Sequence, residues 1–200
     1  MIATPATPLP TRPESPCSAL VSPTIPDVHT RPVEAADAEA LMAIYNVEVL
    51  ETTVTFDVNP RSLEEQVEWI AEHRGVHVAL VAIDPEGDAG PRGARGETIA
   101  GFASIGPYRP RAAYATTVEN SVYVERSARG RGVGRLLLDD LIDAAQGAGF
   151  HSMIARIVGE NDASIRLHEA CGFEMVGIER EVGRKHGRWL DVIELQRLLA

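Results

Sequence analysis

The sequence predicts an α/β (α+β) protein with about seven strands and about four helices in a single domain. Three features indicate this class. Residues Thr117–Val124 alternate β-branched and polar side chains, which is typical of a half-buried strand. Residues 133–148 space their apolar side chains as an amphipathic helix does. A turn rich in glycine and arginine joins the two segments, so a strand runs through a glycine turn directly into a helix.

The first half of the chain predicts one short strand, two helices and two longer strands. The short strand lies near residues 30–33, the helices cover 38–50 and 62–73, and the longer strands cover 77–83 and 98–105. Asp37 and Ser62 each precede a helix and are expected to cap its first turn, because their side-chain oxygens can accept backbone N–H groups there. Segment 84–97, with its glycines and prolines, is expected to form a flexible hairpin loop without a site.

The second half predicts helices and strands that alternate. After a connection at 106–111, strands cover 113–124 and 153–158, and helices cover 133–148 and 163–171. The apolar run in 153–158 favours a central, partly parallel position in the sheet. Asn161 or Asp162 is expected to cap the last helix. The chain finishes as two strands around a basic turn, with the strands at 173–181 and 189–196 and the turn at 183–188.

Composition narrows the class of protein. The 200 residues carry a formal net charge of -10, with 44% hydrophobic and 24% charged residues, which suits a globular protein with a good-sized core. The acidic balance argues against nucleic acid as the main partner. No apolar run approaches the ~18–20 residues of a membrane span, and the N-terminus does not resemble a secretory signal. Cys17 and Cys171 lie in different contexts, so a disulfide framework is not expected and a reducing cytoplasm is the simplest location.

The N-terminal segment differs in composition from the rest of the chain. Residues 1–28 are rich in proline, serine and threonine and can bury little apolar surface. Such a segment does not offset its own ordering entropy, so we expect a disordered leader before a domain at 29–200. A docking peptide is the alternative interpretation of this leader.

The glycine and arginine turn is the strongest functional feature. Backbone N–H groups converge at a helix start, where the helix dipole adds a partial positive charge, so the turn is suited to an anion. Four arginines gather there in an otherwise acidic chain, namely Arg126, Arg129, Arg131 and Arg135. Such a patch indicates an anionic ligand, and a structural turn with solvated arginines is the alternative.

Two signatures and the order of the elements resemble the GNAT N-acetyltransferase superfamily. The family's acyl-CoA signature is Arg or Gln, two residues, Gly, one residue, then Gly or Ala, and it stands here at residues 129–134. Asn161 followed by the Leu-His-Glu-Ala-Cys-Gly-Phe run at 167–173 is similar to the family's late helix and the start of the next strand. The resemblance covers roughly residues 29–197. It implies a single mixed, mostly antiparallel sheet flanked by helices, acetyl-CoA as co-substrate and no metal.

Within the superfamily, the chain resembles the phosphinothricin and methionine-sulfone N-acetyltransferase group. The residues that carry this likeness are Ile44-Tyr45-Asn46, the strand Thr117–Val124, and the segments 166–169 and 185–191. The resemblance implies acetyl transfer by direct attack to a small amino acid or analogue, of the phosphinothricin or methionine sulfone and sulfoximine type. It also implies a homodimer. A protein N-terminal or lysine acetyltransferase and a non-catalytic acyl-CoA sensor are the alternatives.

The resemblance also implies which residues bind acetyl-CoA. Amides of the glycine turn would cradle the diphosphate, and glycine avoids a Cβ where the backbone must approach a phosphate closely. The preceding strand would offer main-chain groups to the pantetheine arm, as to an added strand. The expected cofactor-binding residues are Val122, Tyr123, Val124, Arg129, Gly130, Arg131, Gly132, Val133, Gly134, Arg135 and Asn161.

Glu119 is the candidate general base, acting through a water. An ammonium group is not nucleophilic, and a carboxylate in a partly apolar cleft has its pKa raised toward the useful range. An outward polar residue without a role is the alternative. The amide of Val122, in a strand expected to be locally bulged, would donate to the carbonyl oxygen of the thioester, by resemblance to the family.

His168 stands where many members of the family carry a tyrosine that protonates the departing thiolate. An imidazole can donate that proton, and a helix histidine that only packs near the site is the alternative. His73 and His77 share a four-residue spacing, but the intervening Gly75 and the lack of a following glutamate make a zinc site unexpected.

The amine acceptor is expected to bind beside the connection at 106–111. Arg109 and Arg111 could clamp an amino-acid carboxylate, because a guanidinium matches it bidentately. Solvated loop arginines are the alternative. The residues expected to shape the rest of the pocket are Phe56, Ala112, Ala113 and Tyr114.

Overall fold

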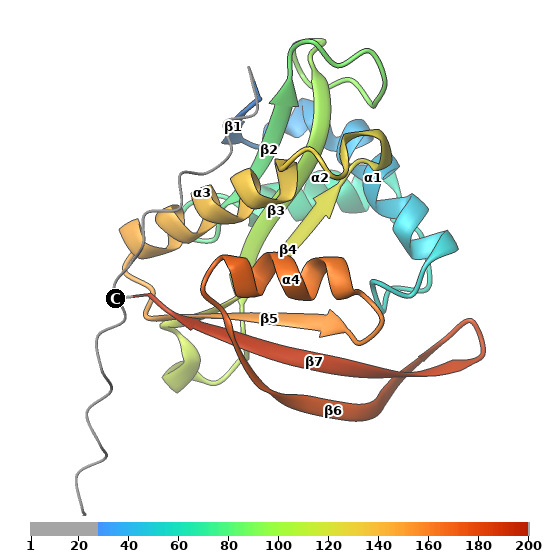
Figure 1. The fold of residues 1–200 in the computed structure, drawn as a ribbon. Helices are drawn as coiled ribbons and strands as arrows, with labels where there is room; N and C mark the ends of the chain where they lie inside the picture. The colour runs from blue at the N-terminus through green and yellow to red at the C-terminus, as the bar shows by residue number, and fades with distance from the viewer. Residues whose placement is uncertain (1–27, 200) are drawn as a thin grey trace, which may run out of the picture.

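A seven-stranded sheet forms the centre of the protein in the computed structural model, which describes residues 28–199. The strand order is β1-β2-β3-β4-β5-β7-β6. Neighbouring strands are antiparallel except for β4 (Thr117–Val124) and β5 (Ser152–Val158), which pair in parallel. Figure 1 shows helices α3 and α4 on one face of the sheet and α1 and α2 on the other. All but one residue of the predicted leader 1–28 lies outside the described residues.

The predicted class is confirmed, since a mixed, mostly antiparallel sheet is flanked by four α-helices. The helices are α1 (Ala38–Glu51), α2 (Leu63–Glu72), α3 (Val133–Gly147) and α4 (Asp162–Ala170). The remaining strands are β1 (His29–Pro32), β2 (Ala79–Asp84), β3 (Thr98–Pro107), β6 (Glu174–Lys185) and β7 (Arg188–Leu198). No described helix is long and apolar enough to cross a membrane.

Apolar residues are buried on both faces of the sheet, which explains why the central strands read as nearly continuous apolar runs. On one face, Leu137 and Leu141 of α3 pack in a cluster with Met153 of β5. On the other face, Leu41 of α1 and Ile70 of α2 belong to a second cluster. All six residues of β2 are buried. The predicted central, parallel position of the 153–158 strand is confirmed by its pairing with β4.

Two of the three predicted helix caps are confirmed. The hydroxyl of Ser62 accepts the amide of Glu65, and the amide of Ser62 donates to the Glu65 carboxylate, which together form a capping box. Asn161, not Asp162, caps α4, since its side chain accepts the amide of Ser164. Asp37 occupies the N-cap position of α1 as predicted, but it makes no side-chain capping bond to that helix, because its buried carboxylate is bound by the Arg31 guanidinium and by the amide of Ala94.

Two predicted boundaries are corrected by local turn geometry. Residues Ala112–Tyr114 form a 3-10 turn, so the strand expected from 113 begins only at Thr117. The expected basic turn at 183–188 is reduced to His186 and Gly187, whose positive φ values of 49° and 76° make the tight two-residue turn that matches the twist of a hairpin. Strands β6 and β7 therefore extend to Lys185 and from Arg188.

Strands β4 and β5 separate part of the way along their length. Their pairing runs from Thr117 and Ser152 to Asn120 and Ala155 and stops there. Strand β4 continues to Val124 along β3, whereas β5 continues to Val158 along β7. Beyond Asn120, one side of β4 faces a gap instead of a neighbouring strand.

Candidate active site

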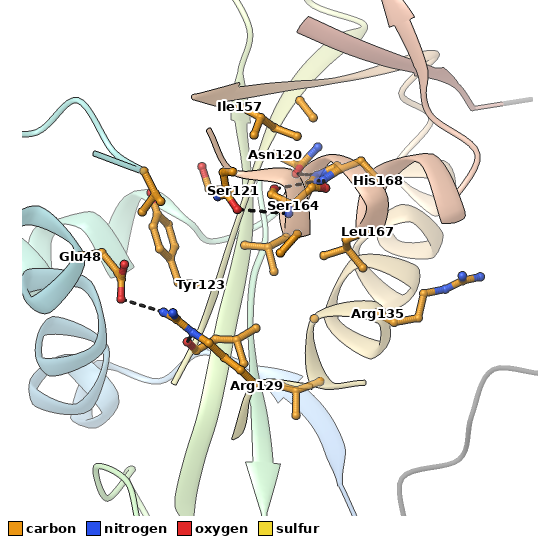
Figure 2. A pocket seen from close by; sticks show the side chains of 18 of the residues that line it. Glu48, Asn120, Ser121, Tyr123, Arg129, Arg135, Ile157, Ser164, Leu167 and His168 are labelled. Atoms are coloured by element: carbon orange, nitrogen blue, oxygen red, sulfur yellow. Dashed lines mark hydrogen bonds and ion pairs between the residues drawn. The ribbon is translucent and has the colours of Figure 1, made fainter. Parts of the chain in front are cut away.

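A cavity of about 400 Å³ occupies the gap between β4 and β5, and we call it the first cavity. Its walls come from the end of β4, the turn before α3, the end of β5 and helix α4. Figure 2 shows side chains of β4, α1 and α4 converging on it. The first cavity therefore extends from the middle of the sheet to the N-terminus of α3.

The unpaired edge of β4 directs main-chain groups into the first cavity. Glu125 donates its amide to the carbonyl oxygen of Ala100 on β3. Because amides alternate sides along a strand, Val122 and Val124 direct theirs away from β3 and toward the gap. The pairing of β4 with β3 shows no register shift, so the expected bulge at Val122 is wrong. The amide of Val122 is open to the gap because β5 diverges.

The glycine turn adopts a backbone conformation that is sterically unfavourable for residues with a side chain. Gly130 and Gly132 have φ values of 75° and 91°, in the left-handed region that glycine enters without steric cost. Gly134 has an ordinary φ, but a Cβ there would lie 3.2 Å from Leu167 of α4. The turn thus brings α3, α4 and β4 together and places the first amides of α3 at the wall of the first cavity, where an anion is favoured.

The arginines of this turn are each paired with a carboxylate of the protein. Arg129 binds Glu48 of α1 at 2.8 Å and also donates to the carbonyl oxygen of Val124. Arg131 binds Asp84 at 2.6 Å and does not line the first cavity. Arg135 binds Asp139 at 2.6 Å, and Figure 2 shows its guanidinium directed away from Arg129. These three arginines therefore do not form a free cationic patch, and the backbone amides of the turn are the groups that it offers to an anion.

His168 of α4 is buried at the wall of the first cavity and is engaged at both ring nitrogens. Nδ1 lies 2.8 Å from the carbonyl oxygen of Ser164, and Nε2 lies 2.9 Å from Oδ1 of Asn120 (Figure 2). Asn120 in turn donates its amide nitrogen to the carbonyl oxygen of Ile154 on β5. Burial lowers the pKa of His168, and the bond to Ser164 opposes this effect. The ring thus ties α4 to the last residue of β4 that pairs with β5.

A second cavity, of about 300 Å³, lies on the α1 and α2 side of β4. It shares Ser121, Tyr123 and Arg156 with the first cavity, so the two meet across β4. Tyr123 shows which face of β4 borders the second cavity, because its ring packs edge-on against Tyr45 of α1, with 5.0 Å between the ring centroids. Glu119, two alternations along the strand, points to the same side and lines the second cavity.

Glu119 is half-buried, and its environment changes its acidity. Burial raises the pKa of its carboxyl group, an effect that the positive charges of Arg156 and Arg109 oppose and the negative charge of Glu194 reinforces. A carboxylate of raised pKa at the wall of a cavity is suited to accept a proton near neutral pH.

The predicted acceptor residues are only partly brought together. Phe56 lines the second cavity. Arg109 donates to the Tyr108 hydroxyl, and Tyr114 packs edge-on against the Tyr108 ring. Arg109 and Tyr114 line neither cavity. The same is true of Arg111, Ala112 and Ala113.

Sequence reasoning missed several residues of the two cavities. Glu48 lines the first cavity, and Tyr45, Asp57, Arg61 and Arg156 line the second. Arg61 lies over the Tyr45 ring, with its central carbon 4.1 Å from the ring centroid. The pattern Ile44-Tyr45-Asn46 was the one signal near these residues, but nothing in the spacing connects α1 to β5.

The arrangement defines a class of protein. An extended gap along an open strand edge, ending over the N-terminus of a helix, suits a long ligand with an anionic end. The half-buried carboxylate beyond the gap suits a base, so together they indicate an acyltransferase that uses a coenzyme A thioester. Within residues 28–199, no group of three or more His, Cys, Asp or Glu side chains is placed to hold a metal ion.

The chain belongs to the GNAT acetyltransferase family. The family model described as an acetyltransferase (GNAT) domain matches residues 31–193. The chain is 42% identical to a phosphinothricin N-acetyltransferase of Streptomyces coelicolor over 175 residues, which cover 86% of this chain and 97% of that protein. It is 40% identical to an L-methionine sulfoximine/L-methionine sulfone acetyltransferase of Pseudomonas paraeruginosa over 167 residues, covering 83% and 91%.

A solved structure agrees with this assignment. A putative acetyltransferase from Salmonella typhimurium, solved with its cofactor acetyl-CoA, superposes with a TM-score of 0.79 at 34% identity. The match covers 87% of this chain and 95% of that one. The predicted membership of the superfamily, and the likeness to the phosphinothricin and methionine-sulfone group within it, are confirmed.

Proposed function

We propose that this protein transfers the acetyl group of acetyl-CoA to the amine of a small amino acid or amino-acid analogue, of the phosphinothricin or methionine sulfone and sulfoximine type. One observation carries the proposal: the two cavities meet at Ser121 and Tyr123 of β4. A thioester in the first cavity and an amine in the second can therefore react directly, since proximity replaces an encounter in solution.

The first cavity supplies the groups that would hold acetyl-CoA. The amides of Gly130, Arg131, Gly132, Val133 and Gly134 would bind the diphosphate at the start of α3. The open edge of β4 would bind the pantetheine arm, with Val122, Tyr123 and Val124 acting as a partner strand does. The capping bond uses the side-chain oxygen of Asn161, so its amide nitrogen is the group available to the same arm. Because Arg129, Arg131 and Arg135 are paired with carboxylates, their part in binding is secondary.

The second cavity supplies the groups that would prepare the amine. Glu119 would take a proton from the ammonium group through a water, leaving a lone pair on nitrogen. That nitrogen attacks the thioester carbon, the C–N bond forms, and the C–S bond breaks with its electron pair on sulfur. The nitrogen is positively charged after the attack and gives its second proton to solvent water, which leaves a neutral amide. The amide of Val122 would stabilise the negative charge on the carbonyl oxygen, because a fixed donor needs no reorganisation during the reaction.

The sulfur must finally take a proton, and His168 is the candidate donor from the sequence. Its two ring nitrogens face Ser164 and Asn120 rather than the centre of the first cavity. That geometry supports a positioning role, in which the ring holds α4 against β4, more strongly than it supports proton donation. A variant of His168, described in the Discussion, separates the two roles.

Cations of the second cavity would recognise the acceptor's carboxylate. Arg61 and Arg156 line this cavity, and although they face Asp57 and Glu179, each guanidinium has further N–H groups to donate. Arg109 and Arg111 do not line this cavity, although the charge of Arg109 acts on Glu119, and we propose a homodimer in which a second copy brings arginines of this loop to the acceptor. The exposed apolar side chains of the edge strand β6, Met175, Val176 and Ile178, support self-association. Light scattering would give the mass, and mixed Arg111→Ala and Glu119→Gln subunits that regain activity would show a shared site.

We also place the protein in the cytoplasm. The support is its cysteine usage, with Cys17 and Cys171 in separate contexts and Cys171 buried as a free thiol. Fractionation of cells that express the full chain would test this location.

An amine panel tests the proposed reaction. Purified protein is mixed with acetyl-CoA and one amine at a time, and release of free thiol is followed. We expect release with amino-acid sulfones, sulfoximines or phosphinothricin. Release only with peptides would support a protein acetyltransferase, and calorimetric binding of acetyl-CoA without release from any amine would support an acyl-CoA sensor. A protein that does not bind coenzyme A at all would end the proposal.

A further inference from the structure

The end of β6, directly before the turn into β7, is packed against the loop that joins α1 to α2. Lys185, at the end of β6, donates from Nζ to the carbonyl oxygen of Thr55 at 2.8 Å. Two residues earlier, Gly183 faces the ring of Phe56 so closely that a Cβ on Gly183 would lie 2.5 Å from two ring carbons. These contacts join two segments that lie about 130 residues apart in the chain.

The loop that the hairpin contacts is a wall of the second cavity. Thr55, Phe56 and Asp57 all line that cavity. The Thr55 hydroxyl lies 3.1 Å from the hydroxyl of Tyr45, which donates to the Asp57 carboxylate at 2.5 Å. A hydrogen bond that fixes the backbone of Thr55 therefore also fixes the neighbouring side chains that shape the cavity.

Lys185 is an unusual anchor because its ammonium group is buried. The residue is 4% exposed, and burial lowers the pKa of its ammonium group, while the carboxylates of Asp57 and Glu48 oppose the shift. A buried ammonium group is costly unless it is hydrogen-bonded. Its bond to Thr55 therefore holds the turn and the loop at one fixed separation.

Gly183 provides the space that the Phe56 ring occupies. Its φ lies outside the left-handed region, so alanine at this position is restricted by the ring and not by the backbone. Gly177, on the same strand, has nothing within 4 Å of the position that a Cβ would take. A Cβ at Gly183 would therefore meet the wall of the second cavity, whereas a Cβ at Gly177 would meet open space.

We propose that the end of β6, directly before the β6–β7 turn, sets the position of Phe56 and thereby the shape of the acceptor cavity, with Lys185 as the anchor and Gly183 as the residue that leaves room for the ring. This inference rests on the proposed function in one respect, that the second cavity takes the acceptor amine. Both residues are positioning residues, since neither lines the cavity itself.

A double-mutant cycle tests the role of Gly183. Gly183→Ala should lower kcat/KM for the amino-acid acceptor by about tenfold or more, because overpacking displaces the ring. The KM for acetyl-CoA should change less than about twofold, since the first cavity is untouched. In the background of Phe56→Ala, Gly183→Ala should have almost no further effect. Gly177→Ala is the matched control and should behave as the wild type.

Lys185→Met provides a second variant that does not involve the ring. It should raise the KM for the acceptor and leave the KM for acetyl-CoA unchanged, whereas Arg184→Met, at the exposed neighbouring position, should do neither. An equal loss from Gly183→Ala with and without Phe56, or a matching rise in the KM for acetyl-CoA, would overturn the inference.

Failure of the proposed function gives a different pattern. In that case the wild type itself transfers acetyl to no amine. The packing contact can still be tested by measuring the melting temperatures of Gly183→Ala, Phe56→Ala and the double variant. The energetic coupling between two residues in contact does not depend on turnover. If the changes in melting temperature of the two single variants add up to that of the double variant, the two residues do not interact. This result would also overturn the inference.

Discussion

The first cavity combines the open edge of β4 and the glycine turn before α3 with side chains of α1, β5 and α4, whereas the second cavity is lined by residues of α1, its following loop, α2 and four strands. In the first, Gly130 and Gly132 set the shape through their positive φ values. In the second, Tyr45, Arg61 and Glu119 come from separate elements. The contrast teaches that the proposed acetyl-CoA cavity is shaped in part by local backbone conformation, while the proposed acceptor cavity depends on which side chains the fold brings together.

Glu119→Gln should have the largest effect, because it removes the only step assigned to the second cavity's base. We expect turnover near pH 7 to fall ~10²–10⁴-fold, the usual contribution of general base catalysis. The loss should shrink at high pH, where the free amine is abundant. Initial rates at saturating acetyl-CoA between pH 6 and pH 10 measure this, with Glu72→Gln at the exposed end of α2 as control. Unchanged turnover at neutral pH would remove Glu119 from the mechanism.

Gly132→Ala should come next and should affect the first cavity only. A side chain at a φ of 91° introduces backbone strain, which costs ~1–3 kcal/mol. If half of this strain appears in the binding free energy, the KM for acetyl-CoA rises about twofold to twelvefold while the acceptor KM stays unchanged. Gly147→Ala is the matched control in the same helix, since its Cβ meets open space. Equal changes in both KM values would contradict the separation of the two cavities.

His168→Gln should lower stability more than turnover. The variant removes a buried ring that contacts Ser164 and Asn120, and an unpaired buried group costs ~1–3 kcal/mol. We expect a lower melting temperature and a kcat within about threefold of the wild type, with His151→Gln at an exposed position as control. A kcat that falls more than tenfold at an unchanged melting temperature would instead assign the thiolate's proton to His168.

The smallest expected effect concerns stability and pH at Glu119. Since burial raises the pKa of this carboxyl group on folding, its contribution to stability is fully present below the pKa of the unfolded chain and is lost as the pH rises through the folded value. Glu119→Gln has no carboxyl group to ionise, so the variant does not lose this stability as the pH rises. The variant should therefore melt a few degrees above the wild type at pH 8, and the advantage should vanish near pH 4. A variant less stable at pH 8 than at pH 4, relative to the wild type, would contradict this sign.

Much of the fold could be predicted because it is local. The helices start and end within a few residues of their predicted bounds, and Ser62 and Asn161 cap as their side chains indicate. The errors at 112–114 and 183–188 are also local, since a 3-10 turn and a tight hairpin differ from their alternatives by two or three backbone angles. Small differences of this kind are the least visible in a sequence.

The pairing of charges could not be predicted. The arginines of the glycine turn suggested a free cationic patch, but Arg129 and Arg131 bind Glu48 and Asp84, which come from α1 and β2. In the same way, Arg109 and Arg111 matched the chemistry of a carboxylate clamp, but neither lines the first or the second cavity. Residue type indicates what a side chain can bind, and the path of the chain decides what lies next to it.

The sequence by itself determined the strand, glycine turn and helix that form one wall of the first cavity, and it placed Glu119 on that strand. These features can be predicted because hydrophobic periodicity, helix caps and positive φ values depend on residues that are close together in the sequence. Only the tertiary structure decided the second cavity, the link from His168 to Asn120, and the contact of Gly183 and Lys185 with residues 55 and 56. Those contacts join residues far apart in the chain, so their geometry follows from how the sheet twists and where β4 and β5 separate.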